Sequence, residues 1–428
     1  MLRRTLIRAA RIVLKVQGHR QARATAAQAA EALARAWGRP VTLQVRQRFR
    51  ATLRCAVQGG NPQGPETVIV KRTAPKGRQR YDPADAEPMS MAYRLFNEWA
   101  GIELATRAGV ATPALLAADR QRGFLVVEDF GDHGFDELLM ADDPRPARAA
   151  ALDYAAALGR LHARTHGRED EYDALRDRLG PRTEALKEVW GSREWFADAL
   201  PALREILAGL ELPADGELDQ ELEKLAEAIA NPGPFRVYTH GDPGPDNLRF
   251  SEDRSMLIDF EHGGFRHAFT DATFVRMLLP TSWRINRLPD ELVTEMEAVY
   301  RRELVVGVPE AAKDDRFAAA LLDGCAFWLV LTLVMALRSQ PGRPTALEQD
   351  AQWGLSSLRQ IVLGRLRSFR SLAGRLDGYP ALADVVRRLE GPLGERWSPL
   401  AEMPLFPAFR GAEAAAESEP ATISERIS

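Results

Sequence analysis

Three strand-like stretches joined by short turns lie near the start of the chain, and they constrain its fold more than any other feature. They are VTLQVRQRF (41–49), TLRCAVQ (52–58) and TVIVKR (67–72), and each is alternating or β-branched. The first connection is a short turn, and the second is the open, Gly- and Pro-rich turn GGNPQGPE. Short turns join antiparallel neighbours, so this region is predicted to be a three-strand antiparallel meander.

Helical and strand patterns flank the meander. ATAAQAAEALARAWG (24–38) predicts a helix before it. After it, SMAYRLFNEWAGIELATRAG (90–109) predicts a helix closed by Gly109, and two further strands follow at LLAAD (115–119) and GFLVVEDFG (123–131). We therefore expect the first 130 residues or so to form a small sheet with one inserted helix.

The remainder of the chain is mostly helical in pattern from residue 147 to about residue 392. Short strands interrupt it at 237–250 and at SMLIDFE (255–261). The apolar run CAFWLVLTLVMAL (325–337) is too short to span a bilayer, and Asp323 interrupts its extension, so it predicts a buried core helix. Residues 411–428 contain few large apolar side chains and predict a disordered tail.

The composition excludes several classes of protein. With 57 basic and 60 acidic residues and a net charge of -3, nothing in the overall charge indicates nucleic-acid binding. The two cysteines, Cys55 and Cys325, lie far apart in sequence and cannot by themselves make a disulfide framework or a metal site. A reducing, cytoplasmic location is the expectation.

The N-terminal residues are basic, with no acidic residue before Glu31. At helical spacing, apolar and basic side chains of residues 1–16 fall on opposite faces. One interpretation is a helix that contacts a membrane surface. The other, which we favour, is a helix that packs on its own domain and leaves a solvated basic face.

The polar loop THGDPGPDN (239–247) and the strand that follows it carry candidate chemistry. Asp242, Asn247 and Asp259 supply hard oxygen atoms of the kind that Mg²⁺ prefers. LRF and MLI can pair as a hairpin around SEDRS, which would bring Asn247 and Asp259 to the same end. Asp242 would then face this point without binding metal and accept a proton. The alternative is that this loop is only a polar turn that joins two strands and has no catalytic role.

Lys71, at a strand end, and Glu98, in the following helix, form a second candidate cluster. The lysine can neutralise nucleotide phosphates, and the glutamate can orient it through an ion pair, although Glu103 shares the helix and is the other candidate partner. The backbone after the apolar strand LVVEDFG can pair with a purine edge. The order of lysine, glutamate, Asp/Asn loop and later Asp matches the phosphoryl-transfer template of protein kinases.

The local sequence narrows this comparison. HGDPGPDN followed by LIDFE closely resembles the aminoglycoside phosphotransferase and choline kinase-like family, a small-molecule branch of the kinase fold. LGRLHA (158–163) and AGVATPALLAAD (108–119) also resemble segments of that family, and the resemblance covers roughly residues 30–340. It implies a two-lobed α+β, protein-kinase-like fold. The expected domains are a helical extension (1–38), an antiparallel-sheet N-lobe (39–130), a larger, mostly helical C-lobe (131–400) and the tail.

The resemblance also implies a role for each matching residue. Asp242 would orient and deprotonate an acceptor hydroxyl, Asn247 and Asp259 would hold Mg²⁺, and Lys71, held by Glu98, would contact the phosphates of ATP, with GTP as the alternative. The remaining assignments are adenine contact through the backbone of Glu128 and Phe130, and support of the loop by His240 and Asp271. The implied partner is a small molecule with a hydroxyl group. His162 and His166, in a helical stretch, are expected to be packing or surface residues.

Two departures from the family pattern leave alternatives open. The turn QRFRATLRC contains no glycine where the family approaches the phosphates closely, so Arg50 or Thr52 would make that contact, or nucleotide binding would be weak. A catalytically impaired nucleotide-binding or regulatory module is therefore the alternative to an enzyme.

The second departure follows Asp259, where the sequence has Phe260 and Glu261 instead of the Phe-Gly of the protein-kinase template. Glu261 is either a further carboxylate near the metal or a solvated acid. EHGGFRH (261–267) is either an acceptor-binding loop or a flexible bend.

Overall fold

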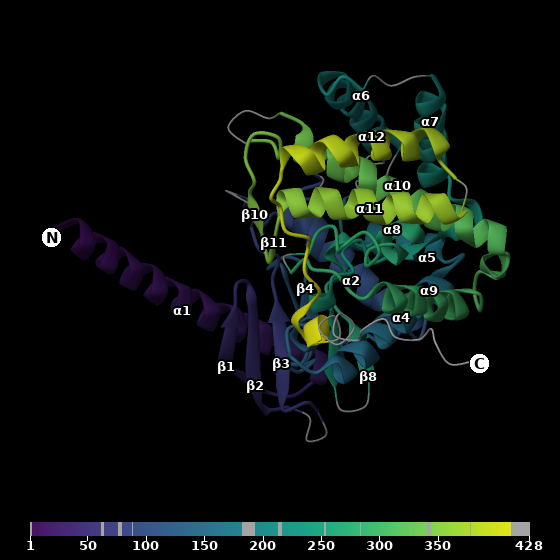
Figure 1. Cartoon of the computed structure of the whole chain (residues 1–428). Helices are drawn as coiled ribbons and strands as arrows, with labels where there is room; N and C mark the ends of the chain where they lie inside the picture. The colour runs from purple at the N-terminus through teal and green to yellow at the C-terminus, as the bar shows by residue number, and fades with distance from the viewer. Residues whose placement is uncertain are drawn as a thin grey trace, which may run out of the picture. The chain divides into compact units, whose positions relative to one another are not determined.

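The chain folds into two compact units, described here one at a time (Figure 1). The sheet unit comprises Met1–Asp132, Asp170–Lys187 and Met256–Gly263, and the helical unit comprises His133–Glu169, Glu188–Ser255 and Gly264–Ser428. The computed structural model describes residues 2–60, 64–75, 79–87, 89–181, 193–212, 216–251, 254–282, 284–339, 344–376 and 378–411, with the backbone alone for 2–19, 193–195, 197, 198 and 251.

Five antiparallel strands form the sheet of the sheet unit, in the order β1-β2-β3-β5-β4. The predicted meander is confirmed, because β1 pairs with β2 and β2 pairs with β3, and the two further strands are also present. The register places Lys71 opposite Thr52 on one side and Leu125 on the other. The strands are β1 (Val41–Phe49), β2 (Thr52–Gly59), β3 (Thr67–Lys71), β4 (Leu115–Asp119) and β5 (Phe124–Glu128).

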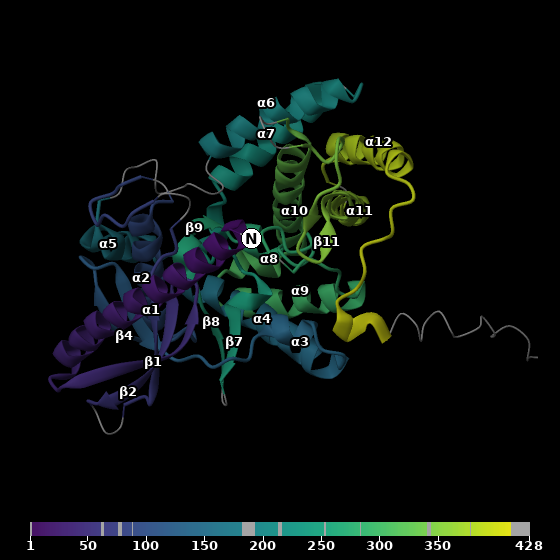
Figure 2. The ribbon, with the colours of Figure 1, turned by 90° about the vertical axis from the view of Figure 1, so that its left-hand side faces the viewer.

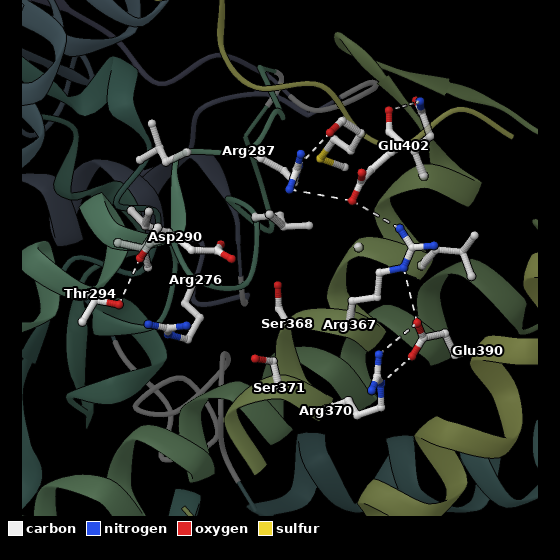
Figure 3. Close-up of a pocket in the computed structure, with 18 of the residues that line it drawn as sticks. Arg276, Arg287, Asp290, Thr294, Arg367, Ser368, Arg370, Ser371, Glu390 and Glu402 are labelled. Carbon is white, nitrogen blue, oxygen red and sulfur yellow. Dashed lines mark hydrogen bonds and ion pairs between the residues drawn. The ribbon is translucent and has the colours of Figure 1, made fainter. Parts of the chain in front are cut away.

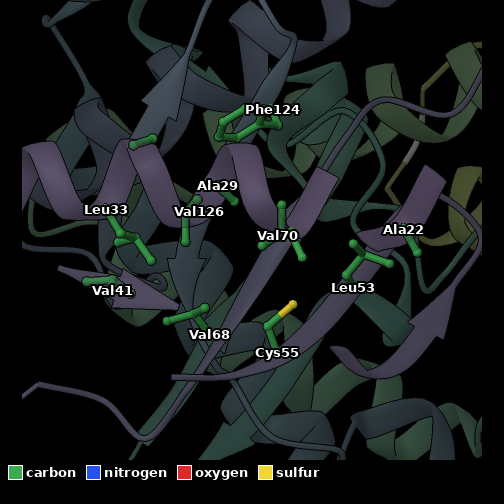
Figure 4. Packing of buried hydrophobic residues seen from close by; sticks show 12 residues of the cluster. Ala22, Ala29, Leu33, Val41, Leu53, Cys55, Val68, Val70, Phe124 and Val126 are labelled. Carbon is green, nitrogen blue, oxygen red and sulfur yellow. The ribbon is translucent and has the colours of Figure 1, made fainter. Parts of the chain in front are cut away.

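One face of this sheet is covered by α1 (Leu2–Trp37). Small side chains such as Ala22 and Ala29 let the helix approach Val68, Val70 and other buried residues of the sheet closely (Figure 4). The helix expected at 24–38 and the basic N-terminal stretch form one continuous helix. The glycine between these two stretches, Gly18, costs the helix only about 1 kcal/mol relative to alanine, so the helix continues through it. The basic face of residues 1–16 lies outside the described side chains.

The second helix of the sheet unit, α2 (Met91–Arg107), contacts β4 and β5. The Ser90 hydroxyl accepts a hydrogen bond of 3.1 Å from the Tyr93 N–H and so caps the first turn. α5 (Glu169–Leu179) belongs, from Asp170 onward, to the same unit. Within the unit, therefore, α1 covers the face of Val68 and Val70, and Lys71 points to the opposite face.

The helical unit is built from paired helices (Figure 2). α4 packs along α9, and α10 packs along both α11 and α6. Of the helices in the described residues, only α10 is long and apolar enough to cross a membrane. The expectation that this apolar run is too short to span is therefore wrong, because the helix continues through Asp323 to 24 residues. The predicted core helix is confirmed, since 83% of the apolar stretch is buried. The helices are α3 (Phe135–Leu139), α4 (Pro144–Thr165), α6 (Arg193–Gly209), α7 (Gly216–Ala230), α8 (Phe269–Ala272), α9 (Asp290–Leu304), α10 (Asp314–Leu337), α11 (Leu358–Leu376) and α12 (Pro380–Arg396).

Short strands position the polar loop in this unit. β6 (Arg236–Thr239) pairs with β9 (Gly264–His267), whose residues are all buried. Within the segment 261–267, residues Gly264–His267 form β9 and are held by pairing with β6, so these residues are not a flexible bend. A role of the segment in binding the acceptor stays a prediction. β7 (Leu248–Ser251) belongs to this unit, and β8 (Arg254–Leu257) crosses the boundary between the units. β10 (Gln352–Trp353) and β11 (Ser356–Ser357) form a two-stranded sheet. The tail from residue 412 lies outside the described residues.

Candidate functional site

In the sheet unit, Lys71 lies between two carboxylates. Its Nζ is 2.9 Å from Glu98 Oε1 and 2.7 Å from Asp259 Oδ1. We call these three residues the Lys71 cluster. The structure thus makes Glu98 the partner of Lys71, whereas Glu103 instead accepts a hydrogen bond from Trp99 Nε1 at 2.7 Å.

Burial and charge act in opposite directions in the Lys71 cluster. Burial alone would lower the pKa of Lys71, but Asp259, Glu98 and Glu261 together raise it. Burial raises the pKa of Glu98, which is only 4% exposed, and the Lys71 ammonium opposes this shift. Glu98 Oε2 is buried and has no hydrogen-bond partner among the described residues. The ammonium is therefore held charged at the end of β3.

Polar side chains of α2 anchor the segment that follows Asp259. The buried Arg94 pairs with Glu261 at 3.4 Å, and Asn97 Nδ2 donates to the Glu261 carbonyl oxygen at 3.4 Å. Glu261 is consequently not a solvated acid. Asp259 itself has a φ of 70°, in the left-handed region that a non-glycine residue adopts only when its surroundings impose it. The helix that carries Glu98 therefore also fixes the backbone beside Asp259.

The residues predicted to contact the nucleotide lie at different places in the sheet unit. Thr52 shares the sheet face of Lys71, because the two are opposite one another on β2 and β3. Glu128 ends β5, and its N–H donates to the Ala114 oxygen at 2.9 Å, so adenine contact would use other backbone atoms of Glu128 and Phe130. Arg50, in the β1–β2 turn, has a φ of 50° and lines a cavity described below.

In the helical unit, the loop 240–247, here called the Asp242 loop, follows β6. The carboxylate of Asp271 accepts hydrogen bonds from the backbone N–H groups of His240 (2.5 Å) and Gly241 (3.2 Å). His240 is fully buried, and its Nδ1 accepts a hydrogen bond of 3.4 Å from the Asp242 N–H. Two backbone donors on one carboxylate fix the conformation of the loop just before Asp242.

Asn247 closes the loop from its other end. Its Nδ2 donates to the Asp242 carbonyl oxygen at 2.8 Å. Since the amide nitrogen is engaged, the side-chain oxygen Oδ1 is the atom that remains to bind a cation. Asn247 and Asp259 belong to different units, so the pairing of these two oxygen ligands stays a prediction. Among the described residues, no group of three His, Cys, Asp or Glu side chains forms a metal site.

Three further residues support the Asp242 loop and were not predicted to do so. The hydroxyl of Thr281 donates to Asp242 Oδ1, and the hydroxyl of Tyr154 donates to the Pro243 oxygen at 2.7 Å. His162 is buried, as expected, but it also bridges Asp271 (3.4 Å) and the Tyr300 hydroxyl (2.8 Å). Only His162 lies in a segment that the sequence singled out.

The segment before Thr281 is conformationally strained. Leu278 and Leu279 have φ values of 59° and 51°, a region that non-glycine residues rarely occupy. The buried Arg365 holds this segment by donating to the carbonyl oxygens of Met277 (2.8 Å) and Leu278 (3.3 Å). Strained backbone that is held in this way often marks a functional site, and here it places Thr281 on Asp242.

A cavity of about 510 Å³ lies in the same unit and has Leu278 in its wall. One side consists of ion-paired residues: Arg367 and Arg370 pair with Glu390, and Arg287 with Glu402 (Figure 3). Ser368 and Ser371 lie between this side and the opposite side, which is formed by Arg276, Asp290 and Thr294 (Figure 3). The lining combines apolar residues with polar residues that carry both signs of charge.

A five-stranded antiparallel sheet carrying a Lys–Glu pair, with a mostly helical second unit carrying an Asp–Asn loop, defines a phosphotransferase of the small-molecule kinase class. A family model described as "Phosphotransferase enzyme family" matches residues 53–304, which is more than half of the chain. The chain belongs to this phosphotransferase enzyme family. The predicted family, the predicted α+β fold class and the prediction that the chain is a small-molecule kinase are confirmed.

Solved structures similar to this chain include several kinases of small molecules. A choline/ethanolamine kinase family protein from Mesorhizobium loti is 16% identical, covers 81% of this chain and 92% of its own, and has a TM-score of 0.40. APH(2")-IIa in a streptomycin–ATP ternary complex is 15% identical, with coverages of 71% and 91% and a TM-score of 0.38. Choline kinase from Cryptosporidium parvum Iowa II is 12% identical, with coverages of 83% and 93% and a TM-score of 0.41. No curated protein matches the chain.

Proposed function

We propose that this chain transfers the γ-phosphoryl group of ATP, or of GTP as the alternative, to a hydroxyl of a small molecule. The observation that carries the proposal is the ion-paired Lys71, which is held charged by Glu98 and Asp259 at the end of β3. A fixed ammonium stabilises the negative charge of nucleotide phosphates, and a preorganised charge needs no reorganisation during the reaction. The same family assignment supports ATP as the nucleotide.

The proposed metal is Mg²⁺, held by Asn247 Oδ1 and the carboxylate of Asp259. This donor set suits the ion, because Mg²⁺ prefers oxygen and binds through one or two protein ligands together with substrate phosphates. When bound, it would neutralise part of the phosphate charge. Glu98 orients Lys71, and Arg94 and Asn97 hold the backbone next to Asp259 in place.

Asp242 is the proposed acceptor of the proton from the attacking hydroxyl. Its backbone is fixed through His240, Gly241 and Asp271, and its Oδ1 already accepts a hydrogen bond from Thr281. The second carboxylate oxygen is the atom that would accept the proton. The rate then depends on how accurately this oxygen is oriented toward the attacking hydroxyl, since positioning supplies a large part of the rate enhancement in phosphoryl transfer.

We place the acceptor in the 510 Å³ cavity of the helical unit. Leu278 lines this cavity and lies three residues before Thr281, which binds Asp242. Its mixed charges and serine hydroxyls suit a polar, hydroxyl-bearing compound. Substituting Ser368→Trp should fill the cavity, raise the KM for the acceptor about tenfold or more and leave the Kd for ATP unchanged. A rise in the Kd for ATP without a change in acceptor KM would place the acceptor elsewhere.

A second candidate function is that of a catalytically impaired nucleotide-binding or regulatory module. The favouring observation is the β1–β2 turn, where Arg50 occupies the left-handed conformation that glycine usually takes. The intact set of Asp242, Asn247 and Asp259 argues against it.

We also propose that the protein is located in the cytoplasm. The buried, free thiols of Cys55 and Cys325 support this proposal, because a reducing compartment keeps cysteines in this state.

One assay separates the two candidates. The full chain is incubated with Mg²⁺ and γ-labelled ATP against a panel of amino alcohols, sugars, choline and aminoglycosides, with Asp242→Asn as the control. Label transferred to an acceptor by the wild type but not by the variant supports the enzyme. ATP binding without transfer to any acceptor, at a rate no higher than that of the variant, supports the regulatory module.

A further inference from the structure

A second cavity, of about 440 Å³, lies in the sheet unit and is lined by arginines. Its walls come from α1, the β1–β2 turn, the segment after β3 and the loop before α2. Four of its lining residues are arginines and none is an aspartate or glutamate: Arg48, Arg50, Arg72 and Arg80. We call this the arginine cavity. A concave site that is lined by positive and by no negative side chains attracts anions.

The arginine cavity is on the α1 side of the sheet. Arg72 follows Lys71 directly, and it donates to Thr25 Oγ1 of α1 at 3.4 Å and to the Arg122 oxygen at 2.9 Å. Lys71, by contrast, points to the opposite face and does not line this cavity. A ligand of the arginine cavity would therefore be separate from a nucleotide that contacts Lys71.

The arginines of this cavity lack acidic partners in the part of the chain that the structure describes. Arg72 bonds only neutral oxygen atoms there, and burial lowers its pKa. No ion pair joins Arg50 or Arg80 to a carboxylate among the described residues. Arg72 is partly buried, whereas Arg48, Arg50 and Arg80 are exposed around the same cavity. Like charges gathered in one concave site repel one another, and an external anion would remove that repulsion.

Arg50 also carries backbone strain. Its φ of 50° is costly for any side chain, by about 1 kcal/mol, and a glycine would remove that cost. The Arg48 guanidinium donates to the Arg50 carbonyl oxygen at 3.3 Å, so the turn itself holds two cavity arginines together. Retaining a strained arginine in a turn suited to glycine points to a function for its side chain.

We propose that the arginine cavity binds a phosphate-bearing anion at a site distinct from the Lys71 cluster. Guanidinium groups match phosphate oxygens in charge and in their forked geometry, and four of them converge here from three segments of the chain. The helix in its wall adds positive charge, since Arg20 and Arg23 lie beside the lining residues Gln21, Ala22 and Thr25 of α1.

The phosphate group can come from a soluble metabolite or from the headgroup of an anionic lipid. Phe49, at the tip of the same turn, distinguishes the two sources. It is 55% exposed and does not line the cavity. An exposed aromatic side chain between two arginines would insert into a membrane interface but would not touch a small soluble anion.

The test is calorimetric titration of the full chain with inorganic pyrophosphate in Mg²⁺-free buffer of low ionic strength. Arg80→Gln and Arg50→Gly should each weaken binding about tenfold or more. Arg387→Gln, which removes an exposed arginine of α12, is the matched control and should bind like the wild type. Thermal unfolding serves as the folding control, and Arg50→Gly should melt no lower than the wild type because it relieves strain.

Isotherms of Arg80→Gln and Arg50→Gly that superimpose on the wild-type isotherm would overturn the proposal. The lipid source is tested by co-sedimentation with phosphatidylcholine vesicles that contain phosphatidic acid. Vesicle binding that is lost in both Arg80→Gln and Phe49→Ser supports a lipid headgroup. Pyrophosphate binding that depends on Arg80, with vesicle binding absent or unchanged in Phe49→Ser, supports a soluble phosphate.

Discussion

The Lys71 cluster of the sheet unit and the Asp242 loop of the helical unit are held in place by different forces. In the sheet unit, Lys71, Glu98 and Asp259 are charged groups that balance one another directly. In the helical unit, Asp242 is positioned by backbone N–H groups and hydroxyls that converge on it and on Asp271. Removing one member should therefore leave an uncompensated charge in the first case and only a misdirected side chain in the second.

The largest effect on activity is expected at Asp242. Asp242→Asn keeps the shape and the hydrogen bond from Thr281 but cannot accept a proton, so kcat should fall about 10³-fold or more. The Kd for ATP should change by less than about twofold, because the phosphates are bound elsewhere. Steady-state kinetics and calorimetry measure the two quantities. An ATP affinity that fell in step with turnover would contradict this division of roles.

The Lys71 cluster should respond in stability as well as activity. Lys71→Met leaves the buried Glu98 without its counter-charge, so the free energy of unfolding in urea should fall by about 3 kcal/mol. Adding Glu98→Gln to this variant should restore part of the loss, since the double variant has no uncompensated buried charge. If the single and double variants were equally unstable, charge balance would not be what holds the cluster together.

A smaller effect is expected at Thr281. Thr281→Ala removes the hydroxyl that orients the Asp242 carboxylate, so kcat should fall about tenfold. KM for ATP should not change, and Thr281→Ser should recover most of the rate because it keeps the hydroxyl. An equal loss in the alanine and serine variants would assign Thr281 to packing alone.

The elements of the sheet unit could be predicted from sequence because their signals are local. Alternation and turn residues placed β1, β2 and β3 to within about two residues, and the helical spacing after Ser90 placed α2. The order of lysine and glutamate in the phosphoryl-transfer template indicates the ion pair of Lys71 with Glu98, which the structure contains. Glu103 was an open alternative, since position along a helix does not determine which carboxylate faces the sheet.

The supports of the Asp242 loop could not be predicted, because they come from distant parts of the chain. Thr281 is separated from Asp242 by 39 residues and Tyr154 from Pro243 by 89, and neither position carries a local pattern. Strand β9 could not be predicted because the adjacent glycines Gly263 and Gly264 suggest a flexible segment, whereas Gly264 pairs with Thr239 of β6. Only the packing of the helical unit reveals these contacts.

The central claim is that Asp259 is a metal ligand beside a phosphate-binding Lys71, and calorimetric titration with ATP on the wild type and Asp259→Asn tests it most directly. With Mg²⁺, the variant should bind ATP about tenfold or more weakly, since a ligand of the ion is lost. Without Mg²⁺, it should bind ATP at least as tightly as the wild type, because Lys71 is released from a carboxylate and one repelling charge is gone. The claim would be contradicted if Asp259→Asn lost ATP affinity by the same factor with and without Mg²⁺. It would also be contradicted if the wild type bound ATP equally well without Mg²⁺.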